Sequence, residues 1–261
     1  MNILLDTAAR PVIGHRGNRA HAPENTIESF AQAIALGADA IEFDVHLSAD
    51  GIPVVHHDPT LMRTTDGHGE IARLTFGELR AVDAGSRFTK DTGKTFPYRG
   101  MGHRIPSLEE VVEAFPTTPL LIEIKAPLAA TQVKRILEQR LAVERVVVDS
   151  FRPEALRVFA GSDIATGASR DGMIRLTRSA LGGRAPGRID FSAVCTPLSY
   201  YGAPLPVKRI ARVARAQGIP VHAWTINDTR IAKDLWLSGL NGIITDDPAR
   251  MIEIRKRLPV T

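Results

Sequence analysis

The sequence is poor in cysteine and in aromatic residues, and it contains no long apolar run. Cys195 is the single cysteine among 261 residues, which excludes an intrachain disulfide and a cysteine-based metal cluster and predicts a buried, inert thiol. No segment reaches the roughly 18 apolar residues of a membrane-spanning helix. Residues 1–10 also lack the pattern of a signal peptide. These features predict a soluble, cytoplasmic protein with no membrane insertion.

The sequence also lacks a basic tract. Its 33 basic and 29 acidic residues are spread along the chain and give a formal net charge of +4. A nucleic-acid partner usually requires lysine and arginine clustered on one surface. We therefore expect no nucleic-acid partner and a small anionic substrate; the oligomeric state cannot be predicted.

Short β-branched runs alternate with helical patterns along the whole chain. This alternation is typical of β/α units that build a parallel sheet, and about 250 residues is an ordinary size for a (β/α)8 TIM barrel. We predict such a barrel as a single catalytic domain over residues 1–261. The predicted strands are 12–15, 40–45, 120–124, 145–150, 163–168, 192–196, 220–224 and 242–245.

Helix starts and faces can be read at three places. Asn25 with Glu28, and Ser107 with Glu110, have the spacing of a capping box. Residues 207–217 place their apolar side chains on one face and their basic side chains on the other. We interpret the basic stripe as the solvated outer face of a helix rather than as a nucleic-acid surface.

One strand-like run, residues 53–56, breaks the alternation. It follows the second strand after the turn signal Asp50-Gly51, which is too short a connection for a parallel neighbour and therefore predicts a hairpin. The hairpin would return His57 to the mouth of the barrel. Residues 59–104 are too long for a plain barrel loop and predict an inserted cap or lid, with one weak helical patch near 75–80.

Three acids are expected at the carboxyl ends of strands. Glu42 and Asp44 are two residues apart, so they share one face of an extended strand, and Glu123 ends the next parallel strand. Carboxylate oxygens suit one divalent cation, Mg²⁺ or Ca²⁺. The alternative is a rim network in which Arg16 and Lys125 neutralise the acids and no metal binds.

The neighbouring cations and imidazoles indicate phosphate chemistry. Arg16 can grip a phosphate through two N–H donors, and Lys125 adds a compact positive charge. His15 and His57 are the candidates for general acid and base catalysis. His46, on the same strand face as Asp44, is a candidate for a supporting contact, and the remaining histidines are interpreted as structural.

The ordered motifs resemble those of the glycerophosphodiester phosphodiesterase family. The matching segments are His15-Arg16-Gly17, 23–26, Glu42-x-Asp44, His57-Asp58, 123–125, 223–227 and 243–246. The resemblance implies hydrolysis of glycerophosphodiesters to sn-glycerol 3-phosphate and an alcohol, such as choline, ethanolamine or glycerol. It further implies metal ligation by Glu42, Asp44 and Glu123, proton transfer by His15 and His57, and phosphate binding by Arg16 and Lys125.

Trp224 matches the family's aromatic residue near the pocket, although a core position would explain it nearly as well. The resemblance leaves three other functions open. A lysophospholipase D-like lipid phosphodiesterase would show a wide apolar channel beside the insertion. A non-catalytic barrel that binds glycerophosphate would not need both histidines. A phosphate-binding barrel of carbohydrate metabolism would hold phosphate on late-strand glycine loops.

Overall fold

Among the residues that the structure describes, eight parallel strands form the wall of a barrel. The computed structural model describes residues 2–183, 185–187 and 189–259. Neighbouring strands follow the order β6, β5, β4, β2, β1, β11, β10, β7, and a parallel bridge between Gly167 and Ala193 joins the two ends. The predicted α/β barrel is thus confirmed. The strands are β1 (Val12–His15), β2 (Ala40–Leu47), β4 (Leu120–Ile124), β5 (Val146–Asp149), β6 (Ala165–Thr166), β7 (Val194–Pro197), β10 (Val221–Trp224) and β11 (Gly242–Thr245).

Strand β6 is the main departure from the predicted strand lengths. Six residues were expected, but only Ala165 and Thr166 pair with β5, opposite Val147 and Val148. Ile164 is buried in the core instead of extending the ladder. Strand β6 therefore contributes the fewest paired residues to the barrel wall.

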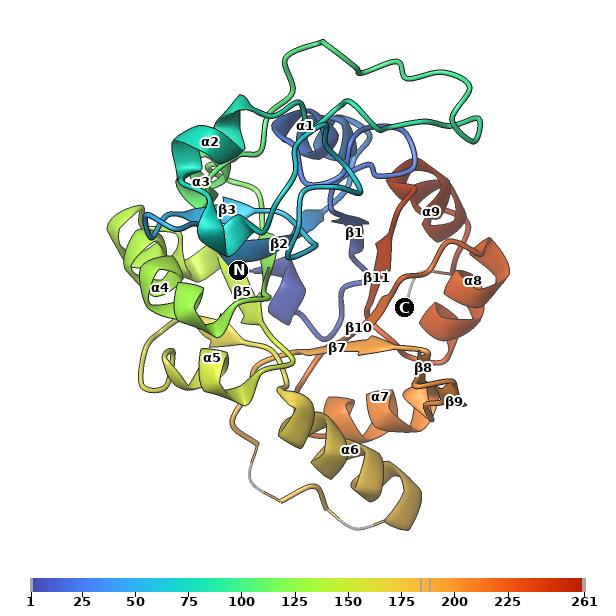
Figure 1. The fold of residues 1–261 in the computed structure, drawn as a ribbon. Coiled ribbons are helices and arrows are strands. Elements are labelled where there is room, and N and C mark those ends of the chain that lie inside the picture. Colours follow the sequence, from blue (N-terminus) through green and yellow to red (C-terminus); the bar gives the residue numbers. More distant parts are fainter. Residues whose placement is uncertain (1, 184, 188, 260–261) are drawn as a thin grey trace.

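Helices surround the strands (Figure 1). Their apolar faces pack on the outside of the barrel; in α7, for example, Val207, Ile210, Ala211 and Ala214 are buried, as the pattern predicted. None of the described helices is long and apolar enough to cross a membrane. The helices are α1 (Ile27–Ala35), α2 (Phe76–Ala81), α3 (Leu108–Ala114), α4 (Ala130–Gln139), α5 (Pro153–Arg157), α6 (Arg170–Gly182), α7 (Val207–Arg215), α8 (Thr229–Leu237) and α9 (Pro248–Arg255).

An N-terminal 3-10 turn, η1 (Ile3–Leu5), closes one end of the barrel. Leu4 is completely buried and joins the apolar cluster contributed by the inward faces of the strands. Its carbonyl oxygen lies 2.9 Å from Nε2 of His222 on β10. Because this end is filled, polar side chains can gather only at the carboxyl ends of the strands.

The predicted hairpin is present. Strand β3 (Pro53–Val55) pairs antiparallel with β2, Gly51 takes the left-handed conformation that the turn requires (φ +79°), and His56 N donates to Asp44 O. The strand after the turn therefore runs back toward the mouth. His57 follows directly and is placed beside Asp44.

The segment 59–104 contains α2 and a 3-10 turn, η2 (Ile71–Arg73), and its buried apolar residues form a small cluster with Val54 of β3 and Ile105. The weak helical patch near 75–80 was thus predicted correctly. Tyr98 Oη donates to the His21 carbonyl and accepts from the Gln32 side chain, which fixes the later part of the segment to the loop before α1 and to α1 itself. Figure 1 shows this segment beside α1.

One predicted helix start is wrong. The capping box of Ser107 and Glu110 is present, but α1 is capped by Thr26, whose side chain accepts from Ser29 N. Asn25 has a left-handed backbone (φ +58°) and points elsewhere, so it cannot cap. Its amide instead donates to Oδ2 of Asp44, 3.0 Å away.

Candidate active site

Three carboxylates meet at the carboxyl ends of β2 and β4. Register places Asp44 opposite Glu123, and Glu42 lies two residues earlier on the same face. Glu42 and Asp44 are almost fully buried, and Glu123 is partly exposed. One oxygen from each of the three lies within 4.8 Å of the others, the only group of potential metal ligands found in the part of the chain that the structure describes.

Two cations lie against this cluster. Lys125 Nζ is 3.0 Å from Asp44 Oδ1 and 2.8 Å from Glu123 Oε2, and Arg16 Nε is 3.1 Å from Asp44 Oδ2. The Arg16 backbone N–H donates to both the carbonyl and the side chain of Glu42. Gly17 follows with φ +90°, where an added Cβ would strike the Ser29 backbone at 2.5 Å. Glycine is required for this approach.

The electrostatics differ among the three acids. Burial, together with the charge of Asp44, raises the pKa of Glu42 well above its ordinary value. Burial also disfavours charge on Asp44, but Lys125 and Arg16 outweigh it and lower the pKa of Asp44. The pKa of Glu123 is raised by burial. Three acids against two cations leave one formal negative charge uncompensated, and an additional cation would stabilise that arrangement.

Each catalytic candidate histidine is hydrogen-bonded to an aspartate. His15 Nδ1 is 2.6 Å from Asp246 Oδ1, and His57 Nδ1 is 2.6 Å from Asp58 Oδ1. Despite partial burial, these contacts and nearby cations lower the pKa of Asp58 and of Asp246 to about 2 each. Both aspartates are therefore ionised at neutral pH. Each orients its histidine ring by contacting Nδ1, which leaves Nε2 as the ring nitrogen not engaged by the aspartate.

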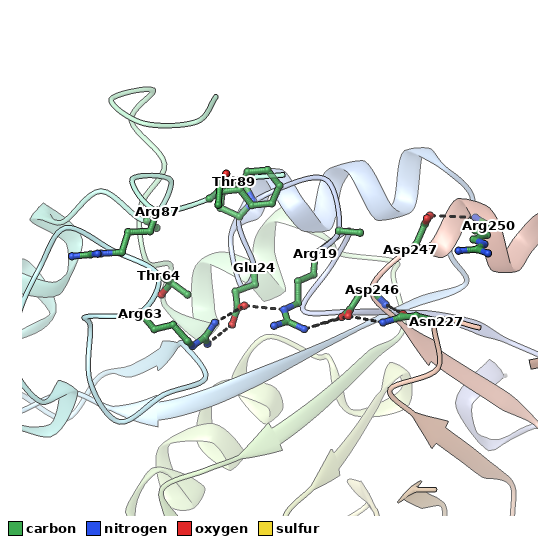
Figure 2. A pocket seen from close by; sticks show the side chains of 14 residues that line it. Arg19, Glu24, Arg63, Thr64, Arg87, Thr89, Asn227, Asp246, Asp247 and Arg250 are labelled. Carbon is green, nitrogen blue, oxygen red and sulfur yellow. Dashed lines mark hydrogen bonds and ion pairs between the residues drawn. The ribbon is translucent and has the colours of Figure 1, made fainter. Parts of the chain in front are cut away.

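Glu24 connects the two histidine–aspartate pairs through Arg19 and Arg63, and Figure 2 shows its carboxylate between these two arginines. Its carboxylate contacts Arg19 at 2.9 Å and Arg63 at 2.7 Å. Arg19 reaches on to Asp246, and Arg63 reaches on to Asp58.

A third guanidinium, that of Arg16, lies 2.7 Å from Glu24. Burial opposes ionisation of Glu24, but Arg63, Arg16 and Arg19 together lower the pKa of this carboxyl far below its ordinary value. A buried anion thus holds three arginines around the site.

A cavity of about 140 Å³ brings these groups together. Phe151 and Trp224 form an apolar wall with ring centroids 5.9 Å apart. The other lining residues are His15, Arg16, Glu42, His57, Leu121, Glu123, Lys125, Asp149, Cys195, Thr225 and Ile244. Imidazoles, carboxylates and cations on one small cavity can bind a phosphate ester and transfer protons to and from it.

Known proteins show the same combination of sequence and fold. The model of the glycerophosphoryl diester phosphodiesterase family matches residues 15–250. A glycerophosphodiester phosphodiesterase of Caldanaerobacter subterraneus subsp. tengcongensis is 32% identical over 253 residues, which cover 94% of this chain and 98% of that protein. The chain belongs to the glycerophosphoryl diester phosphodiesterase family.

Solved structures of this family share the fold. A domain from Mycobacterium tuberculosis superposes with a TM-score of 0.84 at 24% identity and covers 96% of this chain and 100% of that one. A phosphodiesterase from Oleispira antarctica, solved with the product sn-glycerol-3-phosphate, gives a TM-score of 0.75 at 29% identity over 95% and 97% of the two chains. The predicted family and enzyme class are confirmed.

The structure brings the predicted site residues of this family member together. His15, His57, Glu42, Glu123, Arg16, Lys125 and Trp224 all line the cavity, and Asp44 is buried directly behind them. His46 Nε2 lies 2.9 Å from the His57 carbonyl, so His46 contacts the backbone of a candidate catalytic residue, and its supporting role stays a prediction. Cys195 is buried, and burial raises the pKa of its thiol, which agrees with an inert cysteine. The catalytic, metal and substrate roles of these residues remain predictions.

Several neighbours were missed by sequence reasoning. Asp246 and Asp58 lie inside the quoted motifs but were given no role, and Glu24 and Asn25 share the segment 23–26. Because these four residues belong to the family motifs, the motifs themselves could have identified them as site residues. Asp149 gave no such signal: it ends β5 opposite Glu123, and burial and the charge of Glu123 raise its pKa to about 7.

Proposed function

We propose that the protein hydrolyses glycerophosphodiesters to sn-glycerol 3-phosphate and an alcohol, with one divalent cation and two histidines. The observation that carries the proposal is the convergence of two oriented imidazoles, three carboxylates and two cations on one cavity. Family membership supports the reaction class, and the product bound to the Oleispira antarctica relative supports a small phosphate ester as ligand.

Glu42, Asp44 and Glu123 would hold the cation, Mg²⁺ or Ca²⁺. The crowding of these three carboxylates around fewer positive charges supports this over a rim network without metal, because the pKa of Glu42 stays raised although Arg16 and Lys125 both act to lower it. When bound, the ion would act as a Lewis acid on a phosphoryl oxygen. Arg16 and Lys125 would grip the remaining phosphate oxygens.

His15 and His57 would divide the proton transfers. Each ring has Nδ1 engaged by an aspartate, so Nε2 is the nitrogen that would exchange a proton with the substrate. One histidine would withdraw a proton from the attacking oxygen, and the other would protonate the departing alkoxide. Trp224, with Phe151, would give an apolar wall to the organic part of the substrate.

The chain is further proposed to act as one catalytic domain in which 59–104 is a cap. Arg63 from this segment binds both Glu24 and Asp58, so the cap is tied to the histidine that follows β3. Cytoplasmic location remains a prediction from the sequence.

Glycerophosphocholine turnover with and without metal tests the proposal. We expect release of sn-glycerol 3-phosphate and choline, loss of turnover after EDTA, and recovery when Mg²⁺ or Ca²⁺ is added back. The His57→Ala variant should lose about 10²- to 10⁴-fold in kcat, yet bind the same number of ions by elemental analysis.

Full turnover by protein shown to be free of metal would overturn the role of the ion. Loss of the ion in His57→Ala would show that His57 ligates it rather than transferring protons. Binding of glycerophosphocholine without turnover in the intact, metal-loaded protein would favour a binding module.

A further inference from the structure

A charged cavity of about 430 Å³ has no role in the proposed reaction. Four arginines line it: Arg63 and Arg87 from the proposed cap, Arg19 from the loop before α1, and Arg250 from α9 (Figure 2). Among the described residues, none lines both this cavity and the catalytic one. Asp246 lies between them, because it lines the charged cavity and contacts a candidate catalytic histidine of the other. The charged cavity is therefore a separate site beside the catalytic one.

Two of these arginines have no carboxylate partner among the described residues. Arg87 Nε donates to the Thr65 carbonyl at 2.6 Å, which fixes the side chain and leaves its terminal nitrogens without a described acceptor. For Arg250, only the backbone N–H is bound, by Asp247, and the guanidinium contacts no described acceptor. Both residues are exposed. Unpaired guanidinium groups on one cavity raise the local concentration of anions.

The acids of this cavity already have other partners. Glu24 is bound by three arginines, and Asp246 contacts one of them and a histidine. Asp247 caps α9 by accepting a backbone N–H. None of these three carboxylates contacts the guanidinium of Arg87 or of Arg250. The positive charge of these two side chains is therefore available to a ligand.

The other two arginines can contact a ligand without losing their present partners. Arg19 binds Glu24 and Asp246 through Nε and Nη1, which leaves Nη2 without a described acceptor. Arg63 uses one N–H of each of its three nitrogens. Each terminal nitrogen of a guanidinium carries a second hydrogen. An anion in the cavity would thus find donors from the proposed cap and from the barrel together.

The size of the cavity and its uncharged walls indicate an organic anion. A water molecule takes about 30 Å³ of liquid, so the cavity volume of about 430 Å³ exceeds what a bare inorganic ion fills. Pro23 and Phe88 add apolar surface beside the arginines. A phosphate monoester carries close to two negative charges at neutral pH and pairs with guanidinium groups through parallel hydrogen bonds. Its phosphate matches the unpaired arginines, and its organic group matches the apolar wall.

We propose that the charged cavity binds a small phosphate monoester, with the phosphate among the four arginines and the organic group against Phe88. The bound ligand would join the two arginines of the proposed cap to the two of the barrel, and so hold the cap in place (Figure 2). This site is additional to the catalytic one and does not depend on hydrolysis there. sn-Glycerol 3-phosphate, the product of the proposed reaction, belongs to this chemical class, as do aromatic phosphate monoesters.

Calorimetric titration of phenyl phosphate and of sn-glycerol 3-phosphate into the Mg²⁺-loaded protein tests the proposal. The catalytic cavity would also take a phosphate monoester, so we expect two binding sites per chain. Arg87→Gln and Arg250→Gln should each weaken one site about 10- to 100-fold, because each removes a charged hydrogen-bond donor. Lys125→Gln should weaken only the other site. The affinities of the two ligands show whether the charged cavity prefers the reaction product or an aromatic ester.

Arg209→Gln on α7 is the matched control. Arg209 is exposed and lies outside both cavities, so this variant loses the same charge elsewhere and should leave both sites unchanged. Without added phosphate monoester, Arg87→Gln and Arg250→Gln should hydrolyse glycerophosphocholine at the wild-type rate, because neither residue lines the catalytic cavity. Circular dichroism and thermal unfolding establish that each variant is folded.

Hydrogen exchange locates the second site by a measurement that does not depend on turnover. Bound phenyl phosphate should slow amide exchange in 84–89 and 246–250, because the ligand would contact both segments. The same protection is expected in Lys125→Gln, and it should be absent from Arg87→Gln at the same ligand concentration.

The outcomes separate this inference from the proposed hydrolase. A single binding site that Lys125→Gln removes would overturn the inference, as would a second site that both Arg87→Gln and Arg250→Gln retain at full affinity. Failure of the intact, metal-loaded protein to hydrolyse glycerophosphocholine, with the second site still present, would remove the hydrolase and leave the phosphate site standing.

Discussion

At the scale of single residues, Glu24 shows how a buried charge can organise an active site from outside it. The carboxylate does not line the catalytic cavity, yet it accepts hydrogen bonds from Arg16, Arg19 and Arg63. Through the last two it is linked to Asp246 and Asp58, and so to both histidines. Its contribution is to hold guanidinium groups in place, so it is a positioning residue.

We expect Glu24→Gln to lower both stability and activity. Loss of the anion leaves three arginines close together without a counter-charge, and breaking a buried ion pair from one side costs about 3 to 5 kcal/mol. Supporting contacts of this kind typically contribute about 10- to 100-fold in activity. Urea unfolding measures the first effect, and kcat for glycerophosphocholine measures the second.

Glu138→Gln on α4 is the matched control for this change. Its carboxylate is 4.0 Å from Lys134 and half exposed, so removing its charge should alter the free energy of unfolding by about 0.5 kcal/mol or less. Glu24→Asp, which keeps the charge, should restore part of the lost activity. If Glu24→Gln matched Glu138→Gln in both measurements, the arginines would not depend on the carboxylate.

The site residues divide into those that strand patterns reveal and those that they do not. Glu42, Asp44 and Glu123 could be predicted because alternation and parallel register place them on one face of adjacent strands. The partners of the histidines could not be derived in this way. Asp246 and Asp58 lie in turns, whose side-chain directions depend on contacts with distant segments such as Arg19 and Arg63.

At the scale of elements, two adjacent residues at the start of α1 have different roles: one caps the helix, and the other contacts the active site. Asn25 and Thr26 are adjacent and both suit a helix cap, so sequence alone does not choose between them. The left-handed backbone of Asn25 decides the question, because it turns the amide toward Asp44 and leaves Thr26 to bond Ser29 N. Backbone conformation of this kind depends on the surrounding fold.

The two residues should therefore respond differently to substitution. Thr26→Ala removes a cap and should lower the free energy of unfolding by about 1 kcal/mol, with metal affinity retained. Asn25→Gly keeps the left-handed backbone but removes the donor to Asp44, so it should weaken metal binding about 10- to 100-fold. Chemical unfolding and metal titration by calorimetry distinguish the two effects. Equal metal affinity in Asn25→Gly and the wild type would show that the amide has no role in the site.

At the scale of the whole molecule, the barrel could be predicted from eight apolar runs and the requirement that a barrel close. Strands buried on both faces appear as continuous β-branched segments, and for this reason β1, β4 and β11 have the predicted bounds. The weak pairing between β6 and β7, where the barrel closes, could not be predicted from the sequence. It follows from the two-residue length of β6 and from the single bridge between Gly167 and Ala193, which depend on packing across the barrel.

This seam should be the first part of the barrel to open. A short strand with few ladder hydrogen bonds has low local stability, so amides in 163–168 and 189–194 should exchange with deuterium before those of β1, β2 and β11. Mass spectrometry of peptic fragments measures the order. Uniform exchange around the barrel would contradict the weak seam.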